Sequence, residues 1–274
     1  MFDNNPYVIK DVNAIILIDF SRYKYFNNLF TMLEHSDLAE YVDTRNAILL
    51  INTFIRLKEC NKLFRWNTSN VKSMKSCFSF CTYIDSYEGI KNWNVSNVIS
   101  LERTFERNTS IKSFNMLRFW NLSNLQILSY TFANCISLID LEGISNWNVN
   151  KVTNFSYAFA NCKSLKSLKG LENWKVNKDA NFIGMFAMCS ELIDCSAIDN
   201  WNLNKNYKYI FDKCDKIERY PIWYDKNNEI NDSFKSDLSI PEENDYMNEK
   251  EKYYKDNAIE TYKAIPRTFA QYFN

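Results

Sequence analysis

The chain has 274 residues, enough for one large domain or two small ones, and its 46% hydrophobic content is typical of a globular protein. Its 33 basic and 33 acidic residues cancel, so no overall field favours nucleic acid or a membrane as partner. Four scattered glycines and one histidine exclude a glycine-rich phosphate loop and a histidine-based metal centre.

The first 20 residues carry no recognisable export signal. Their only apolar run, Ala14 to Ile18, is bracketed by Asp11 and Asp19 and is far too short to cross a bilayer. We therefore expect a protein made without a cleaved signal and located in the cytoplasm. A cell-surface or host-cell location is the alternative.

Residues 1–62 are expected to form a helical N-terminal cap. Segment 44–60 places apolar side chains at helical spacing, and segment 21–36 predicts a second helix. Such a cap would cover the apolar face that a terminal repeat exposes. Leu57, Cys60 and Leu63, just before Trp66, also match apolar positions 18, 21 and 24 of the 27-residue repeat that follows, so this segment is expected to lead into the first coil.

Residues 63–224 contain a sequence repeat of 27 residues. Six tryptophans stand 27 residues apart: Trp66, Trp93, Trp120, Trp147, Trp174 and Trp201. With each Trp at position 0, position 12 of the first five units is Phe and position 15 is Cys in all of these but one. The sixth unit keeps this pair as Phe211 and Cys214, two residues early.

A sustained period of this length predicts a six-coil solenoid. Apolar residues recur about every three positions, which fits neither an amphipathic helix nor an alternating strand. Equivalent residues of successive coils should stack about 4.8 Å apart, so Trp, Phe and Cys would form three ladders. The asparagines beside Trp suit a corner. Gly89, Gly143 and Gly170, all at position 23, indicate a tight bend.

The unit WNVNKVTNFSYAFANCKSLKSLKGLENW (147–174) resembles the BspA-like leucine-rich repeats. Their units read W-[DN]-x-S-[NK]-V-x-x-M-x-x-M-F-x-x-C-x-S-L-x-x-L, and the match covers about residues 57–224. The resemblance implies leucine-rich-repeat coils with a short parallel β-strand near S-L-x-x-L and no enzymatic activity. It also implies an adhesive or protein-binding role, found in some relatives at bacterial surfaces.

Residues 225–274 differ in composition, with eleven acidic and seven basic side chains. Segment 225–245 is polar and predicts an irregular linker. Segment 246–265 could form a helix before Pro266, either packed on the last coil or mobile. We expect an acidic tail that is partly helical or disordered.

No constellation of catalytic residues is found. The eight cysteines replace small or apolar residues at repeat positions, which favours buried free thiols over disulfides or zinc ligands. His35 has no evident catalytic partner and is expected at a solvated helix end. We therefore expect no enzyme, no cofactor and no metal; an active site would need residues 1–62 or the tail.

Function is expected in the exposed residues between the fixed positions. Positions 19 and 20 form a variable pair in each unit, and lysines recur at position 4. The candidate partner-binding residues are Lys112, Asp140, Lys151, Lys166, Lys169, Lys178, Asp194 and Lys205. The lysines could attract an acidic partner, or they could form only a solvated, solubilising edge.

Together these features predict a monomeric, non-catalytic protein-protein interaction module, including one that acts on a host. Its partner would be a protein, with no nucleic-acid binding and no membrane insertion. The alternative is a cell-surface adhesin exported by an unrecognised route.

Overall fold

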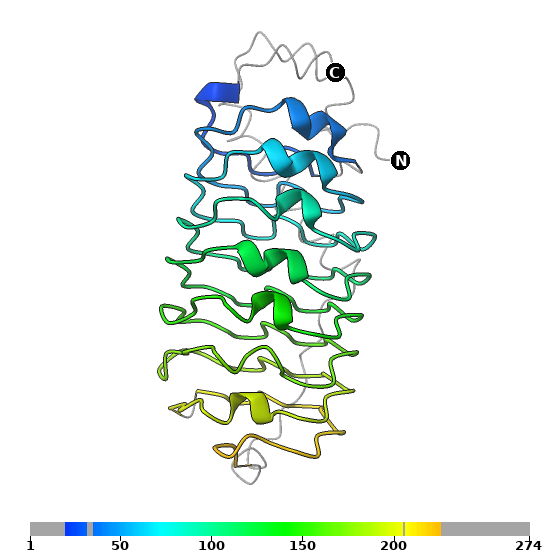
Figure 1. Ribbon diagram of the computed structural model, residues 1–274, viewed down its shortest axis with the longest axis vertical. Helices are drawn as coiled ribbons and strands as arrows, with labels where there is room; N and C mark the ends of the chain where they lie inside the picture. Colours follow the sequence, from blue (N-terminus) through cyan, green and yellow to red (C-terminus); the bar gives the residue numbers. More distant parts are fainter. Residues whose placement is uncertain (1–19, 32–34, 205, 226–274) are drawn as a thin grey trace, which may run out of the picture. The chain divides into compact units, whose positions relative to one another are not determined.

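The computed structural model describes residues 20–31, 35–204 and 206–225, which follow a path of stacked coils (Figure 1). Residues that are 27 apart in the sequence lie side by side. The backbone N–H of Ile99 donates to the carbonyl oxygen of Lys72 at 2.8 Å, and the N–H of Gln126 donates to that of Ile99 at 2.8 Å. The period of the sequence is therefore also the period of the backbone.

Neighbouring coils are joined by isolated parallel bridges. The longer column lies at position 7 and contains Tyr25, Leu49, Ser73, Ser100, Ile127, Asn154 and Asn181. A shorter column lies at position 20 and contains Ser167, Asp194 and Arg219. The resemblance places its strand near this second column. Among the described residues, both columns consist of single bridged residues rather than of longer strands.

The backbone leaves the extended conformation soon after position 7 because positions 10 and 14 are left-handed. In the coil that begins at Trp93 these residues are Arg103 (φ 55°) and Arg107 (φ 61°), and in the next coil they are Tyr130 (φ 55°) and Asn134 (φ 63°). Left-handed φ is unfavourable for residues with a Cβ, but it directs alternate amides to the next coil. The N–H of Arg103 thus reaches the carbonyl oxygen of Ser129 at 3.0 Å.

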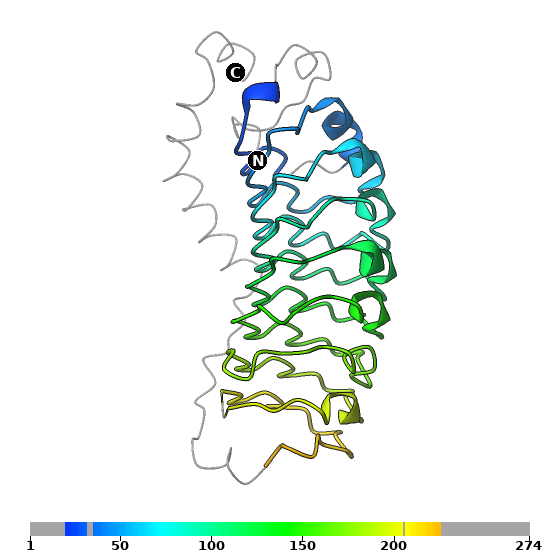
Figure 2. The same cartoon turned by 60° about the vertical axis from the view of Figure 1, so that its left-hand side comes forward.

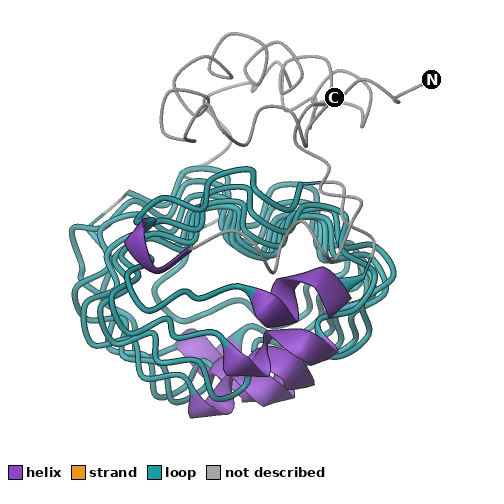
Figure 3. Ribbon diagram, turned by 90° about the horizontal axis from the view of Figure 1, so that it is seen from above, coloured by secondary structure: helices purple, strands orange, loops and turns teal. Residues whose placement is uncertain are grey.

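The helices of the described residues are short 3-10 turns. They are η1 (Phe20–Arg22), η2 (Ser36–Tyr41), η3 (Asn61–Arg65), η4 (Glu88–Ile90), η5 (Asn115–Phe119), η6 (Glu142–Ile144) and η7 (Ser196–Ile198). Helices η3 to η7 each start at position 22 of their coil and line one side of the stack (Figures 2 and 3). The coil that begins at Trp147 lacks this turn, and its Gly170 has a φ of +105°.

The glycines at position 23 are needed for space. A Cβ on Gly89 would lie 1.8 Å from the carbonyl oxygen of Cys60, and one on Gly143 would lie 2.2 Å from that of Phe114. Neither glycine has a positive φ. The bend predicted from the sequence is present, and its glycines allow one coil to approach the backbone of the preceding coil.

A ladder of phenylalanine rings runs through the core. Its members are Phe30, Phe54, Phe78, Phe105, Phe132, Phe159, Phe186 and Phe211. Successive centroids are 5.2–5.9 Å apart, and successive ring planes differ by 3–12°. All eight rings are buried. They contribute a large part of the apolar area that holds the coils together.

The ladder begins inside the region predicted to be a helical cap. Leu49 bridges both Tyr25 and Ser73, so segment 44–60 forms a coil and the helix predicted there is not formed. The described part of segment 21–36 also follows a coil, apart from the ends of η1 and η2. Leu50 and Phe54 are buried between neighbouring coils rather than on a helix face. Residues 1–19 and 32–34 of the predicted cap lie outside the described residues.

The described coils end at an aromatic cluster. The edges of Tyr220 and Tyr224 pack on Phe211, with centroids 5.8 and 5.1 Å away. The indole N–H of Trp223 donates to the carbonyl oxygen of Ile198 at 2.8 Å. The predicted tail, apart from Asp225, lies outside the described residues.

Candidate interaction surface

The cysteines belong to the core. All eight are buried and free. Five thiols donate to the carbonyl oxygen of a ladder phenylalanine in the preceding coil at 3.1–3.3 Å: Cys81, Cys135, Cys162, Cys189 and Cys214. Burial raises the pKa of Cys162 from an ordinary 9.0 to about 12, so this thiol stays protonated near neutral pH. The burial predicted for the cysteines is confirmed, and these thiols are not reactive groups.

The tryptophans are buried as well. Five indole N–H groups donate to a carbonyl oxygen of the preceding coil at 2.8–3.2 Å: those of Trp66, Trp93, Trp120, Trp147 and Trp174. The indole N–H of Trp201 is buried and has no partner. The asparagines beside Trp close turns, as when Asn94 Oδ1 accepts from the N–H and Oγ of Ser96. The buried ladder tryptophans therefore do not contribute to a binding surface.

Of the lysines at position 4, Lys151 takes over a structural role. In earlier coils this position is Asn, and the amide of Asn124 donates to the carbonyl oxygen of Ser96 at 2.9 Å. Lys151 Nζ makes the equivalent bond to Ser123 at 2.9 Å and also lies 3.3 Å from Asn124 Oδ1. Lys178 is exposed, and Lys205 lies outside the described residues. Lys151 therefore serves the corner between two coils.

The two candidate aspartates also stabilise turns. Asp140 Oδ1 accepts from the N–H of Glu142 at 3.2 Å, and Asp194 Oδ1 accepts from the N–H of Ser196 at 2.8 Å. The bonds from Ser196, with the charge of Arg219, lower the pKa of Asp194. Both aspartates are half-buried. Their carboxylates thus hold the start of η6 and η7 and are less available to a partner.

Positions 16 and 19 carry exposed residues in the middle coils. Two isoleucines are exposed there, Ile136 at 37% and Ile139 at 55%. The flanking coils carry exposed lysines at the same positions. We call this set the lysine-isoleucine surface; it consists of Lys112, Ile136, Ile139, Lys163 and Lys166.

Backbone hydrogen bonds make this surface continuous. The N–H of Ile139 donates to the carbonyl oxygen of Lys112 at 3.0 Å, and the N–H of Ser164 donates to that of Ile136 at 3.1 Å. Ile139 therefore lies directly beside Lys112. Ser164 lies beside Ile136, and Lys163 is the residue before Ser164. Position 4 is a separate column, because its bonds run to positions 3 and 4 of the preceding coil.

Several charges around this surface are already paired. Lys169 Nζ lies 3.2 Å from Glu142 Oε1, and Lys216 Nζ lies 2.6 Å from Glu191 Oε1. The ion pair with Lys216, helped by the charge of Lys166, lowers the pKa of Glu191. In the described parts of the chain, the ammonium groups of the surface have no ion pair with a carboxylate. The surface is therefore apolar at its centre with these lysines on either side, and Lys169 lies at its paired edge.

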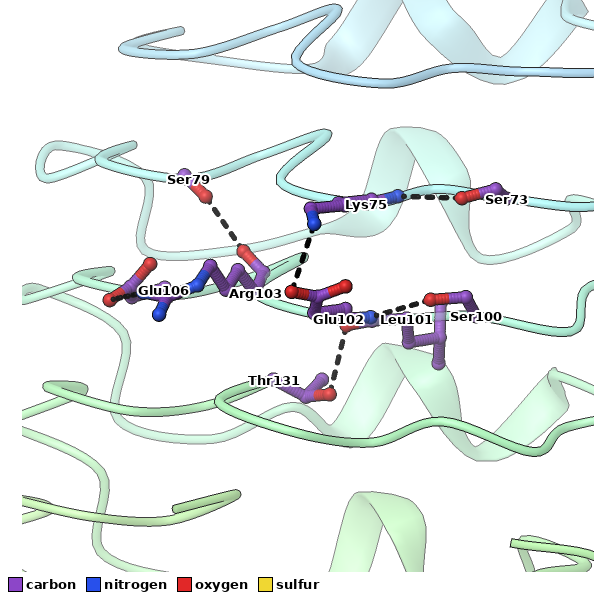
Figure 4. Close-up of polar contacts among 9 residues, drawn as sticks. All are labelled: Ser73, Lys75, Ser79, Ser100, Leu101, Glu102, Arg103, Glu106 and Thr131. Atoms are coloured by element: carbon purple, nitrogen blue, oxygen red, sulfur yellow. Dashed lines mark hydrogen bonds and ion pairs between the residues drawn. The ribbon is translucent and has the colours of Figure 1, made fainter. Parts of the chain in front are cut away.

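A second polar cluster, which was not predicted, lies at positions 9 to 13 (Figure 4). Lys75 Nζ lies 3.0 Å from Glu102 Oε1, and Arg103 Nη1 lies 2.9 Å from Glu106 Oε1. The Arg103 guanidinium also lies 4.0 Å from the ring centroid of Tyr130. The varied residue types at position 10 were the available signal. These pairs balance their charges and tie neighbouring coils together, so the cluster is a weaker candidate for binding.

The described residues therefore define a repeat protein. The residue types that recur from coil to coil lie mostly in the core, and those that vary lie mostly on the outside. One family model matches the chain over residues 23–116, 49–139 and 109–223. The chain belongs to this family, which is described as Mycoplasma protein of unknown function, DUF285. No curated protein and no solved structure matches the chain.

Two further findings concern sites of other kinds. In the part of the chain that the structure describes, no group of three or more His, Cys, Asp or Glu side chains is placed to hold a metal ion. The helices described in residues 20–31, 35–204 and 206–225 are all too short to span a bilayer.

Proposed function

We propose that the protein is a non-catalytic interaction module that binds a protein partner through the lysine-isoleucine surface. The observation that carries this proposal is that each coil has buried positions of constant residue type and outer positions of varying residue type. Position 12 is a buried phenylalanine in coil after coil, whereas positions 16 and 19 are exposed or half-buried and change from one coil to the next. Repeat proteins build binding surfaces from variable residues on such a constant frame.

The proposal includes the fold class. The parallel bridges and the 27-residue return of the backbone support a repeat solenoid of the leucine-rich-repeat kind. The resemblance of residues 57–224 to BspA-like repeats supports the same class and a protein-binding role. The family description assigns no function.

The location we propose is the cytoplasm of the producing cell, with a host cell or the cell surface as alternatives. Fractionation of intact cells decides among them. Recovery of the chain in the fraction released by protease treatment of whole cells would favour an adhesin.

The test begins with affinity capture from the native cell, followed by purification of each captured protein. Binding of the purified partner is then measured by calorimetry for wild type, Lys166→Glu and Lys178→Glu. Both lysines are exposed, so both variants should keep the fold. We expect Lys166→Glu to weaken binding at least tenfold and Lys178→Glu to leave it unchanged. Absence of any reconstituted complex, or equal binding by both variants, would overturn the proposal.

A further inference from the structure

We infer that the lysine-isoleucine surface binds an acidic amphipathic helix of its partner. This inference rests on the proposed function and adds the chemistry and shape of the binding segment. It is carried by three features of the described residues: two exposed isoleucines on one coil, lysines on both neighbouring coils, and the regular spacing between coils.

The first feature is apolar surface in a basic setting. Single exposed apolar residues are common, but Ile136 and Ile139 lie three positions apart on the same coil. Lys112 lies beside Ile139, and Lys163 precedes Ser164, the coil neighbour of Ile136. A ligand that covers the isoleucines thus comes within reach of several ammonium groups, which favours apolar side chains flanked by carboxylates.

The second feature is the order along position 19. Lys112, Ile139 and Lys166 occupy this position in three successive coils, and the carbonyl oxygen of Lys166 accepts from Ile193 at 2.9 Å in the coil beyond. The column therefore reads basic, apolar, basic. A complementary segment of a partner presents an acidic, an apolar and a second acidic side chain in the same order.

The third feature is the distance between steps of this column. Neighbouring strands and bridged coils are spaced by about 4.8 Å. One face of an α-helix presents residues i, i+3 or i+4, and i+7, which rise by about 5 Å per step. Alternate residues of an extended strand are about 6.7 Å apart and lose the register after one step. A helix lying along the column therefore places a carboxylate, an apolar side chain and a second carboxylate over the three residues.

Three carboxylates near this surface are already engaged, whereas Asp85, at position 19 of the coil before Lys112, is exposed. Glu142 pairs with Lys169, Glu191 pairs with Lys216, and the carboxylate of Asp140 is half-buried and accepts from a backbone N–H. A bare polyanion would satisfy the lysines but leave the isoleucines exposed, so the observations favour a peptide over a nucleic acid or an anionic lipid surface.

The test uses a fluorescein-labelled, alanine-rich helical peptide with Glu at i, Leu at i+4 and Glu at i+7. Its binding to the full chain is followed by fluorescence anisotropy. We expect binding that Lys166→Glu and Ile139→Ser each weaken at least tenfold, that Lys178→Glu leaves unchanged, and that rising salt weakens. A peptide with Lys in place of Glu should not bind. Circular dichroism of each variant verifies the fold.

Three outcomes would overturn the inference: equal binding of the acidic and basic peptides, equal binding by wild type and Ile139→Ser, and binding of phosphatidylserine vesicles without binding of the peptide. If Lys166→Glu still weakens binding of the purified partner while the acidic peptide does not bind, the helix inference fails and the proposed function stands. If Lys166→Glu does not weaken binding of the purified partner, the proposed function fails.

Discussion

The indole hydrogen bonds can be tested because one ladder tryptophan lacks its bond. Trp174 and Trp201 occupy neighbouring coils and are almost equally buried, at 2% and 3% exposure. Trp174 Nε1 donates to the carbonyl oxygen of Ile144 at 3.0 Å, whereas Trp201 Nε1 is buried without a partner. Replacing each by Phe removes similar packing but removes a hydrogen bond only at Trp174.

The expected costs follow from these environments. Loss of part of the ring should cost about 1–2 kcal/mol at either site. At Trp174 the lost hydrogen bond adds about 1 kcal/mol. At Trp201 the change removes an unsatisfied buried donor, which offsets about 1 kcal/mol or more. We therefore expect Trp174→Phe to be less stable than Trp201→Phe by about 2 kcal/mol.

The assay is urea unfolding of the full chain, followed by far-ultraviolet circular dichroism and compared at a common m-value. Trp147→Phe is a second control, because Trp147 Nε1 donates to the carbonyl oxygen of Leu117 at 3.2 Å and the residue lies farther from the last coil. It should behave like Trp174→Phe. Equal costs at Trp174 and Trp201 would refute the reasoning, as would a cost below about 1 kcal/mol for Trp147→Ala, where burial predicts about 3–5 kcal/mol.

Three further predictions concern single sites. Gly143→Ala should lower the unfolding free energy by at least about 2 kcal/mol in urea unfolding, because its Cβ would lie 2.2 Å from the carbonyl oxygen of Phe114; an unchanged midpoint would contradict this close approach. The unfolded Cys162 thiol loses its proton above an ordinary pKa of 9.0, while the folded thiol keeps it up to about 12, so stability is full below pH 9 and falls as pH rises through this window. From pH 8 to 10 the wild type should lose about 1.4 kcal/mol more than Cys162→Ala, and equal slopes would argue against a buried thiol. Lys151→Asn should change thermal stability by less than about 0.5 kcal/mol, since Asn makes the same corner bond in earlier coils; a larger loss would show that the ammonium charge itself matters.

Much of the core could be predicted from the sequence because burial restricts residue type at each position of a fixed period. The phenylalanine ladder and the cysteine positions follow directly from this restriction. The asparagine turns were also predictable, since the side chain of Asn94 acts within two residues of its own position.

The coils before Trp66 were not predicted, for a physical reason. Tyr25 and Leu49, and again Leu49 and Ser73, are bridged 24 residues apart, so a search for a 27-residue period misses them. In segment 44–60 the apolar spacing of three to four residues suits both a helix and a coil buried on two sides. Only the neighbouring coils distinguish the two, and they are distant in sequence.

The candidate surface was predicted in part. Lys112 and Lys166 were expected to be exposed at position 19, and they are. The structural bond of Lys151 depends on a carbonyl oxygen 28 residues earlier, which no local pattern reveals. Ile139 was likewise expected to face outward at position 19, whereas the exposure of Ile136 was hidden, because an isoleucine in a repeat normally signals burial.

The most direct test of the central claim is photo-crosslinking in the native cell with benzoylphenylalanine at residue 139. A matched chain carries the same group at residue 178, where the native lysine is also exposed but lies outside the lysine-isoleucine surface. The account predicts a protein crosslinked from residue 139, on a segment with acidic residues flanking an apolar one, and no such product from residue 178. Crosslinking of the same protein from both residues, or from residue 178 alone, would contradict it.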